Sequence, residues 1–130
     1  MAQRRIAISL VDTRSAAIPI AGDPVLLRQA ILGILSNAME AMPGGGRIEI
    51  RIESRDDRHS VRVAFADTGR GIAPENLGRV FDPFFTTKPR GLGLGLALTR
   101  RIVAHCMGTV AVQSVEGRGT SVILDFAAAA

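Results

Sequence analysis

The stretch FDPFFTTKPRGLGLGL, residues 81–96, holds three of the five phenylalanines and the only lysine of this 130-residue chain, and it then alternates glycine with leucine. A buried aromatic ring stabilises a fold by up to about 3 kcal/mol, whereas glycine leaves the adjoining backbone easy to rearrange. The phenylalanine half of the stretch therefore favours a fixed, buried position, whereas the glycine half favours a backbone that can rearrange. Any account of this protein has to explain why they adjoin.

The glycines Gly91, Gly93 and Gly95 precede a helical pattern. A helix that begins behind a glycine-rich loop offers unpaired N–H groups and a positive dipole end to an anion such as phosphate. The loop is not a Rossmann fingerprint, because leucine stands where the third glycine belongs, and no Gly-Lys-Ser or Gly-Lys-Thr follows to make a Walker loop. A flexible surface loop is the alternative.

Length and composition predict a single domain, residues 1–130, with a core of its own. Hydrophobic residues make up 47% of the chain and charged residues 22%, which excludes a disordered chain. No apolar run approaches the roughly 18 residues that cross a bilayer, and no secretory signal pattern opens the chain. We therefore expect a cytoplasmic domain that makes no direct membrane contact.

The net charge of +4 comes almost wholly from arginine. The arginines are scattered among acidic residues, and the chain has no tyrosine or tryptophan to stack on bases, so we expect no nucleic-acid partner. The single cysteine, Cys106, excludes an internal disulfide and a cysteine-based zinc site, and we expect it to be buried.

Helical and strand patterns alternate without a regular βαβ rhythm. Asp23 and Pro24 predict the start of a long helix, because the carboxylate caps free N–H groups and proline suits the first turn. A second helix is predicted over residues 94–107. Strands are predicted over residues 5–12, 47–54, 60–67, 109–115 and 120–127, with hairpins joining the second to the third and the fourth to the fifth. The first helix should bury an apolar stripe made of Leu27, Ala30, Ile31, Ile34, Ala38 and Ala41.

Two polar residues stand out from these patterns. Asp67 ends a strand just before Gly69 and Gly71, where a carboxylate can accept a hydrogen bond from an exocyclic amine such as that of adenine. Asn37 lies on the polar edge of the first helix, where its amide oxygen suits Mg²⁺, an ion that takes most of its ligands from water and phosphate. Each also has a simpler explanation, an ordinary Asp-Thr-Gly turn and a solvent-facing amide.

The combination is more specific than its parts. Five segments, in order, resemble the N, G1, F, G2 and G3 boxes of the catalytic, ATP-binding domain of sensor histidine kinases, a family that shares the Bergerat ATP-binding fold with gyrase and MutL. The resemblance runs from about residue 6 to residue 126 and looks most like the nitrogen-regulation, FixL and CckA-like branch. The segments are LRQAILGILSNAMEAMPGGG (27–46), DTGRGI (67–72), FDPFFTTK (81–88), GLGLGLALTRRIV (91–103) and EGRGTSV (116–122).

The resemblance implies a site for ATP, with ADP as product, and for Mg²⁺. Asn37 would coordinate the metal that bridges the phosphates, Asp67 would bind the adenine amine, and Lys88 would reach the terminal phosphate. Phe81, Phe84 and Phe85 would anchor a mobile ATP lid. The remaining binding residues would be Gly69 and Gly71 in the adenine pocket, Thr120 beside Asp67, and Gly91, Gly93, Leu94, Gly95 and Leu96 around the phosphates.

The fold implied by residues and resemblance together is an α/β two-layer sandwich, a mixed sheet of about five strands with helices on one face and a lid. The implied activity is that of a protein-histidine kinase in two-component signalling. The domain would donate the γ-phosphoryl group to a histidine on a separate dimerisation domain, which then serves the receiver domain of a response regulator. Neither His59 nor His105 resembles the acceptor motif, so we expect little turnover by the domain alone. The full-length kinase can still be membrane-anchored.

Some positions depart from the family's pattern. Gly33 stands where many histidine kinases have a second asparagine, and Glu40 stands where lysine or arginine is frequent. These departures favour an alternative, a regulatory nucleotide-binding module that has lost transfer activity and acts through protein contacts. A serine kinase of the anti-sigma-factor type is a third possibility, although it usually lacks the FDPFFTTK wording. The segment 106–108 replaces the common His-Gly-Gly and should be structural.

Overall fold

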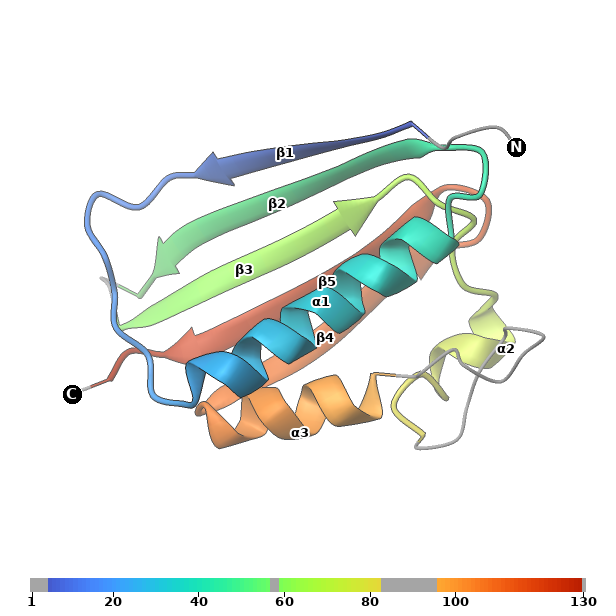
Figure 1. Ribbon diagram of the computed structural model, residues 1–130. Coiled ribbons are helices and arrows are strands. Elements are labelled where there is room, and N and C mark those ends of the chain that lie inside the picture. The colour runs from blue at the N-terminus through green and yellow to red at the C-terminus, as the bar shows by residue number, and fades with distance from the viewer. Residues whose placement is uncertain (1–4, 57–58, 83–95, 130) are drawn as a thin grey trace.

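A computed structural model describes residues 5–56, 59–82 and 96–129 of the chain. The strands form one sheet in the order β1-β2-β3-β5-β4, and helices cover one of its faces (Figure 1). The elements are β1 (Ile6–Asp12), α1 (Pro24–Glu40), β2 (Gly46–Arg55), β3 (Ser60–Asp67), α2 (Pro74–Leu77), α3 (Ala97–His105), β4 (Gly108–Val115) and β5 (Gly119–Ala127).

The sheet is mixed, as predicted, because β1 runs parallel to β2 while every other pair is antiparallel. The predicted hairpins are both present. The second predicted helix was too long at its C-terminal end, since α3 stops at His105 and Met107 takes a left-handed φ of 60°. The short helix α2 was not predicted, because four residues carry no measurable periodicity.

Helix α1 starts where the sequence predicted. The Asp23 carboxylate accepts a hydrogen bond from the Val25 N–H at 2.8 Å, and proline occupies the first turn. Its buried residues, Ala30, Ile34 and Ala38, belong to the predicted stripe. The helix therefore owes its position to one local cap and one apolar face.

The core lies between the helices and the sheet. Val103 of α3 and Leu124 of β5 are fully buried, and Phe65 and Phe126 pack in the same cluster. Cys106 is 2% exposed in this cluster, which confirms the expectation that it is a packing residue.

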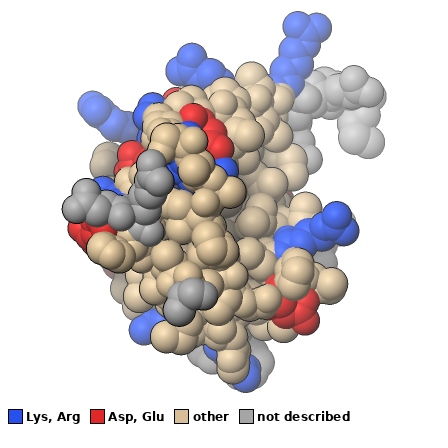
Figure 2. Space-filling view, turned by 90° about the vertical axis from the view of Figure 1, so that its left-hand side faces the viewer, with Lys and Arg blue, Asp and Glu red and all other residues tan. Residues whose placement is uncertain are grey.

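The topology gathers the ends of several helices and strands at one end of the molecule. The C-terminal ends of β3 and α1, the turn between β4 and β5, helix α2 and the start of α3 all lie at the right-hand end of Figure 1. Figure 2 looks onto the opposite end, where acidic and basic side chains are interspersed among uncharged ones. In the part of the chain that the structure describes, no helix is long and apolar enough to cross a membrane.

Candidate functional site

The carboxylate of Asp67 is held at the C-terminal end of β3. Its Oδ1 accepts hydrogen bonds from the Gly69 N–H at 2.8 Å and from the Thr120 N–H at 3.3 Å. Within the described ranges, Oδ2 accepts no hydrogen bond from the protein. Burial raises the pKa of Asp67 above 3.8, although the two N–H bonds oppose that shift. The site thus presents a half-buried carboxyl group whose geometry is set by one oxygen and whose other oxygen can accept.

The glycines after Asp67 are packed too closely to carry side chains. A Cβ on Gly69 would lie 2.8 Å from both the Cβ and the carbonyl oxygen of Ala41. Gly71 has a φ of 71°, and a Cβ there would overlap the carbonyl oxygen of Val115. Both predicted glycines therefore serve close backbone approach, which brings the loop against α1 on one side and the β4–β5 turn on the other.

A hydroxyl that the sequence reasoning missed ties this loop to the hairpin. Ser114 Oγ accepts from the Ile72 N–H at 2.8 Å and donates to the Gly119 carbonyl oxygen at 2.9 Å. It also lies 2.9 Å from Thr120 Oγ1. One side chain of β4 thereby contacts the residue after Gly71 and the two residues that open β5.

A signal for Ser114 was present in the sequence. The inward positions of β4 alternate as Val110, Val112 and Ser114, so a hydroxyl takes the place where the pattern calls for an apolar side chain. A polar group on the core face of a strand must find hydrogen-bond partners, and this one does.

The end of α1 contacts the same loop. The Arg70 N–H donates to the Ala41 carbonyl oxygen at 3.0 Å, and the Ala41 N–H donates to the Asn37 carbonyl oxygen at 3.1 Å. Half-buried Asn37 therefore lies one helical turn before the residue that holds the loop. One further turn back, a Cβ on Gly33 would meet only Thr99 Oγ1 within 4 Å, at 3.9 Å, among the residues that the structure describes. These residues therefore leave room for a Cβ at position 33.

The start of α3 differs from expectation in one respect. The Leu96 N–H donates to the Val80 carbonyl oxygen at 2.6 Å, so this amide is occupied within the protein rather than offered to a phosphate. Phe81 packs partly buried against the core, and the guanidinium carbon of Arg100 lies 4.9 Å from its ring centroid. Phe81 is thus held against the core, while the lid that it is predicted to anchor lies outside the described residues.

Several predicted residues lie outside the described part of the chain. These are Lys88, Gly91, Gly93, Leu94 and Gly95, together with Phe84 and Phe85.

Asn37 offers Mg²⁺ one ligand, its amide oxygen, and not a full set of ligands. An amide oxygen is a hard donor of the kind this ion accepts, and Mg²⁺ usually keeps several waters and phosphate oxygens. Among the described residues, no group of three or more His, Cys, Asp or Glu side chains is placed to hold a metal. Asn37 supplies one oxygen of this kind, so it suits a metal that brings water and phosphate ligands with it.

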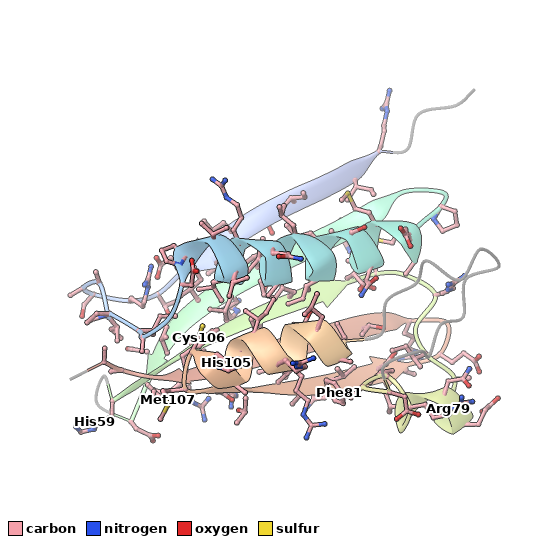
Figure 3. The ribbon with its side chains drawn as sticks, turned by 60° about the horizontal axis from the view of Figure 1, so that its bottom comes forward. His59, Arg79, Phe81, His105, Cys106 and Met107 are labelled. Carbon is pink, nitrogen blue, oxygen red and sulfur yellow. The ribbon has the colours of Figure 1, made fainter. Side chains whose placement is uncertain are left out.

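Both histidines lie away from this site. Figure 3 shows His59 and His105 at one end of α3 and Phe81 and Arg79 at the other. His59 is exposed, and its Nδ1 lies 2.6 Å from the Asp56 carbonyl oxygen. A group bound near Asp67 would therefore not face either histidine of the same chain.

Comparison with known proteins identifies the family of this chain. The family described as "Histidine kinase-, DNA gyrase B-, and HSP90-like ATPase" matches residues 22–130. The chain belongs to this ATPase family. Sporulation kinase E of Bacillus subtilis (strain 168) is 42% identical to this ATPase domain over 102 residues, which are 78% of this chain and 14% of that kinase.

Solved histidine-kinase structures share the fold of this ATPase domain. Full-length ShkA in complex with AMPPNP superposes with a TM-score of 0.78 at 33% identity, covering 96% of this chain and 26% of ShkA. Histidine kinase ThkA in complex with the response regulator protein TrrA superposes with a TM-score of 0.76 at 26% identity, covering 95% of this chain and 34% of ThkA. The chain thus spans about a third or less of these relatives.

Proposed function

We propose that this ATPase domain binds Mg-ATP and donates its γ-phosphoryl group to a histidine on a separate dimerisation domain. The observation that carries the proposal is the Asp67 carboxylate, which uses Oδ1 to hold its own loop and leaves Oδ2 to accept from a ligand. An exocyclic amine is the part of adenine that can donate to such an oxygen.

The loop that follows Asp67 is held in place by the protein itself. Arg70, between Gly69 and Gly71, donates its N–H to the Ala41 carbonyl oxygen at 3.0 Å and accepts from the Gly117 N–H at 2.7 Å. The close packing of Gly69 against Ala41 and of Gly71 against Val115 further fixes the loop that carries the carboxylate. Because the hydrogen bonds are already made, little ordering remains to oppose binding.

The phosphates would extend from the purine toward Asn37 and the start of α3. Bound Mg²⁺ would neutralise phosphate charge, and Asn37 is the described residue that would ligate it through its amide oxygen. We assign the phosphate cradle to Gly91, Gly93, Leu94 and Gly95, with Lys88 at the terminal phosphate. Leu96 is left out, because its N–H bonds Val80.

Transfer would then act by positioning and electrostatics on a histidine supplied by another domain. Both histidines of this chain lie at the far end of α3, which supports an acceptor in trans. The complex of ThkA with TrrA supports a response regulator as the next partner. Since ATP is the donor, we place the domain in the cytoplasm. The sequence motif NAMEAMPGGG, residues 37–46, further leads us to propose the nitrogen-regulation branch of these kinases.

Gly33 favours a second candidate, a nucleotide-binding module that has lost transfer activity. An added Cβ there makes no close contact with the described residues, so their packing does not require glycine. Mixing the domain and labelled ATP with a separate helical hairpin that carries the acceptor histidine distinguishes the two. Labelled hairpin supports the kinase, and nucleotide binding without label supports the module.

The nucleotide site itself is tested by calorimetry with ADP, with and without Mg²⁺. Asp67→Asn keeps an acceptor for the two N–H bonds but can place a donor where Oδ2 accepts, so we expect ADP affinity to fall about 100-fold or more. Asp56→Asn, at an exposed turn residue with a φ of 51°, is the matched control and should bind like the parent. Equal affinities for all three proteins would refute the adenine site.

A further inference from the structure

The hydrogen bonds of Ser114 determine which way the hydroxyl of Thr120 points. A carbonyl oxygen only accepts, so the 2.9 Å contact between Ser114 Oγ and the Gly119 carbonyl oxygen requires the single Ser114 hydroxyl proton. The Ile72 N–H also donates to Ser114 Oγ. The remaining contact, at 2.9 Å to Thr120 Oγ1, is then made by the proton of Thr120.

This arrangement leaves Thr120 without a proton to give to a ligand. Its hydroxyl donates to Ser114, so only lone pairs remain on Oγ1. If the Ser114 proton turned toward Thr120 instead, two acceptor oxygens would face each other at the Gly119 carbonyl. The hydrogen-bond pattern therefore has one consistent assignment.

Thr120 lies directly beside the purine-binding carboxylate of the proposed function. The two residues are opposite each other in the antiparallel register of β3 and β5, so their side chains share one face of the sheet. The Thr120 N–H also bonds Asp67 Oδ1 at 3.3 Å. An acceptor-only hydroxyl is thus added to a carboxylate that also only accepts when ionised.

We propose that Ser114 is a positioning residue that makes this pocket selective for an amino-bearing purine edge over an oxo-bearing one. For purines bound in the same orientation, adenine presents its 6-amino group to the two acceptors, whereas guanine presents its 6-carbonyl oxygen, which finds no donor there. The inference rests on the proposed function, because it concerns the same site. It adds the residue that sets base specificity without touching the base.

The test compares ADP and GDP binding by calorimetry in the parent and in Ser114→Ala. Removing the serine hydroxyl frees the Thr120 proton to donate to guanine, so the ADP-to-GDP affinity ratio should fall about tenfold. Ser114→Thr keeps a hydroxyl at this position and should keep most of the parent ratio. The double variant Ser114→Ala with Thr120→Val has no hydroxyl left to donate, and it should reject GDP again relative to Ser114→Ala.

The outcomes separate this inference from the proposed function. If the parent binds no nucleotide, the proposed function fails. If the parent binds ADP but Ser114→Ala keeps the parent ratio, or weakens both nucleotides equally, Ser114 is only structural and this inference is wrong. Should Ser114→Ala not fold, Thr120→Val alone decides, since the loss of the acceptor must lower the ratio and an unchanged ratio overturns the inference.

Discussion

The two ends of the helix–sheet sandwich are built by different means. At the Asp67 end, backbone and polar groups meet directly, with hydrogen bonds joining the 67–72 loop to α1, β4 and β5. At the opposite end, the loop between β1 and α1 closes over the sheet with apolar side chains, tied by a hydrogen bond from the Ala129 N–H to the Pro19 carbonyl oxygen at 2.8 Å. That end contains a cavity of about 220 Å³, lined by Arg14, Ile18, Ile20, Leu27, Ile31, Ile52, Val61, Val63, Leu124 and Phe126.

The contrast shows where the fold tolerates change. Where backbone fills the space, as at Gly69, an added carbon meets atoms that cannot move without shifting the chain. Where side chains fill the space and leave a cavity, an added carbon has room, while a removed one enlarges the void. The binding end should therefore resist additions, and the opposite end should suffer from deletions.

The largest expected effect is a deletion at the cavity end. Leu124 is 0% exposed and lines the cavity, so Leu124→Ala should lower the free energy of unfolding by about 3–5 kcal/mol, measured by urea denaturation. Leu98→Ala, at a side chain that is 44% exposed, is the control and should cost under about 1 kcal/mol. A similar loss in both would show that burial does not distinguish them.

An addition at the binding end should cost somewhat less. Gly71→Ala places a Cβ against the Val115 carbonyl oxygen at a φ of 71°, so the turn must shift, and we expect a loss of about 2–3 kcal/mol in the same assay. Gly117 has a similar φ of 84°, but an added Cβ there has no described residue within 4 Å, so Gly117→Ala should lose only about 1 kcal/mol. Equal losses would mean that strain alone, and not the contact, makes glycine necessary at position 71.

Adding one methyl group at each of two valines compares the cavity with the tightly packed core. Val63 lines the cavity, so Val63→Ile should raise the free energy of unfolding by up to about 1 kcal/mol. Val122, 8% exposed and packed in the core cluster with Phe65, does not line it, and Val122→Ile should lower the value by about 1 kcal/mol or more. If both substitutions change the free energy of unfolding in the same direction, the cavity does not distinguish the two positions.

The smallest effect concerns the half-buried carboxyl group of Asp67. Burial raises the folded-state pKa of Asp67 above 3.8, so its contribution to stability is present below that pH and is lost as the pH rises through the folded-state pKa. Asp67→Asn does not titrate. Urea unfolding of both proteins between about pH 4 and about pH 7 should therefore show the parent losing stability relative to the variant as the pH rises. A difference that does not change with pH would show that the site imposes no ionisation cost.

Much of the candidate site was visible in the sequence, although its assembly was not. Asp67, Gly69, Gly71 and Thr120 were predicted as binding residues, and the structure brings them together at one end of the sheet. Ser114 was missed: the alternation of β4 marks its hydroxyl as unusual on the core face, but only the fold shows that its partners are Ile72, Gly119 and Thr120. The occupied amide of Leu96 was likewise not foreseeable, since Val80 is its partner through the fold and not through helical periodicity.

What the sequence determined by itself was the five strands and the two longer helices, but not the short helix α2. Alternating apolar residues specify the strands, the Asp23–Pro24 cap starts α1, and glycines mark the sharp turns, because each of these depends on neighbours within a few residues. Only the tertiary structure decided which oxygen of Asp67 is committed, where the proton of Thr120 goes and which end of the molecule is loosely packed. Those outcomes depend on contacts between segments far apart in the chain, such as residues 67 and 120, and no local pattern encodes them.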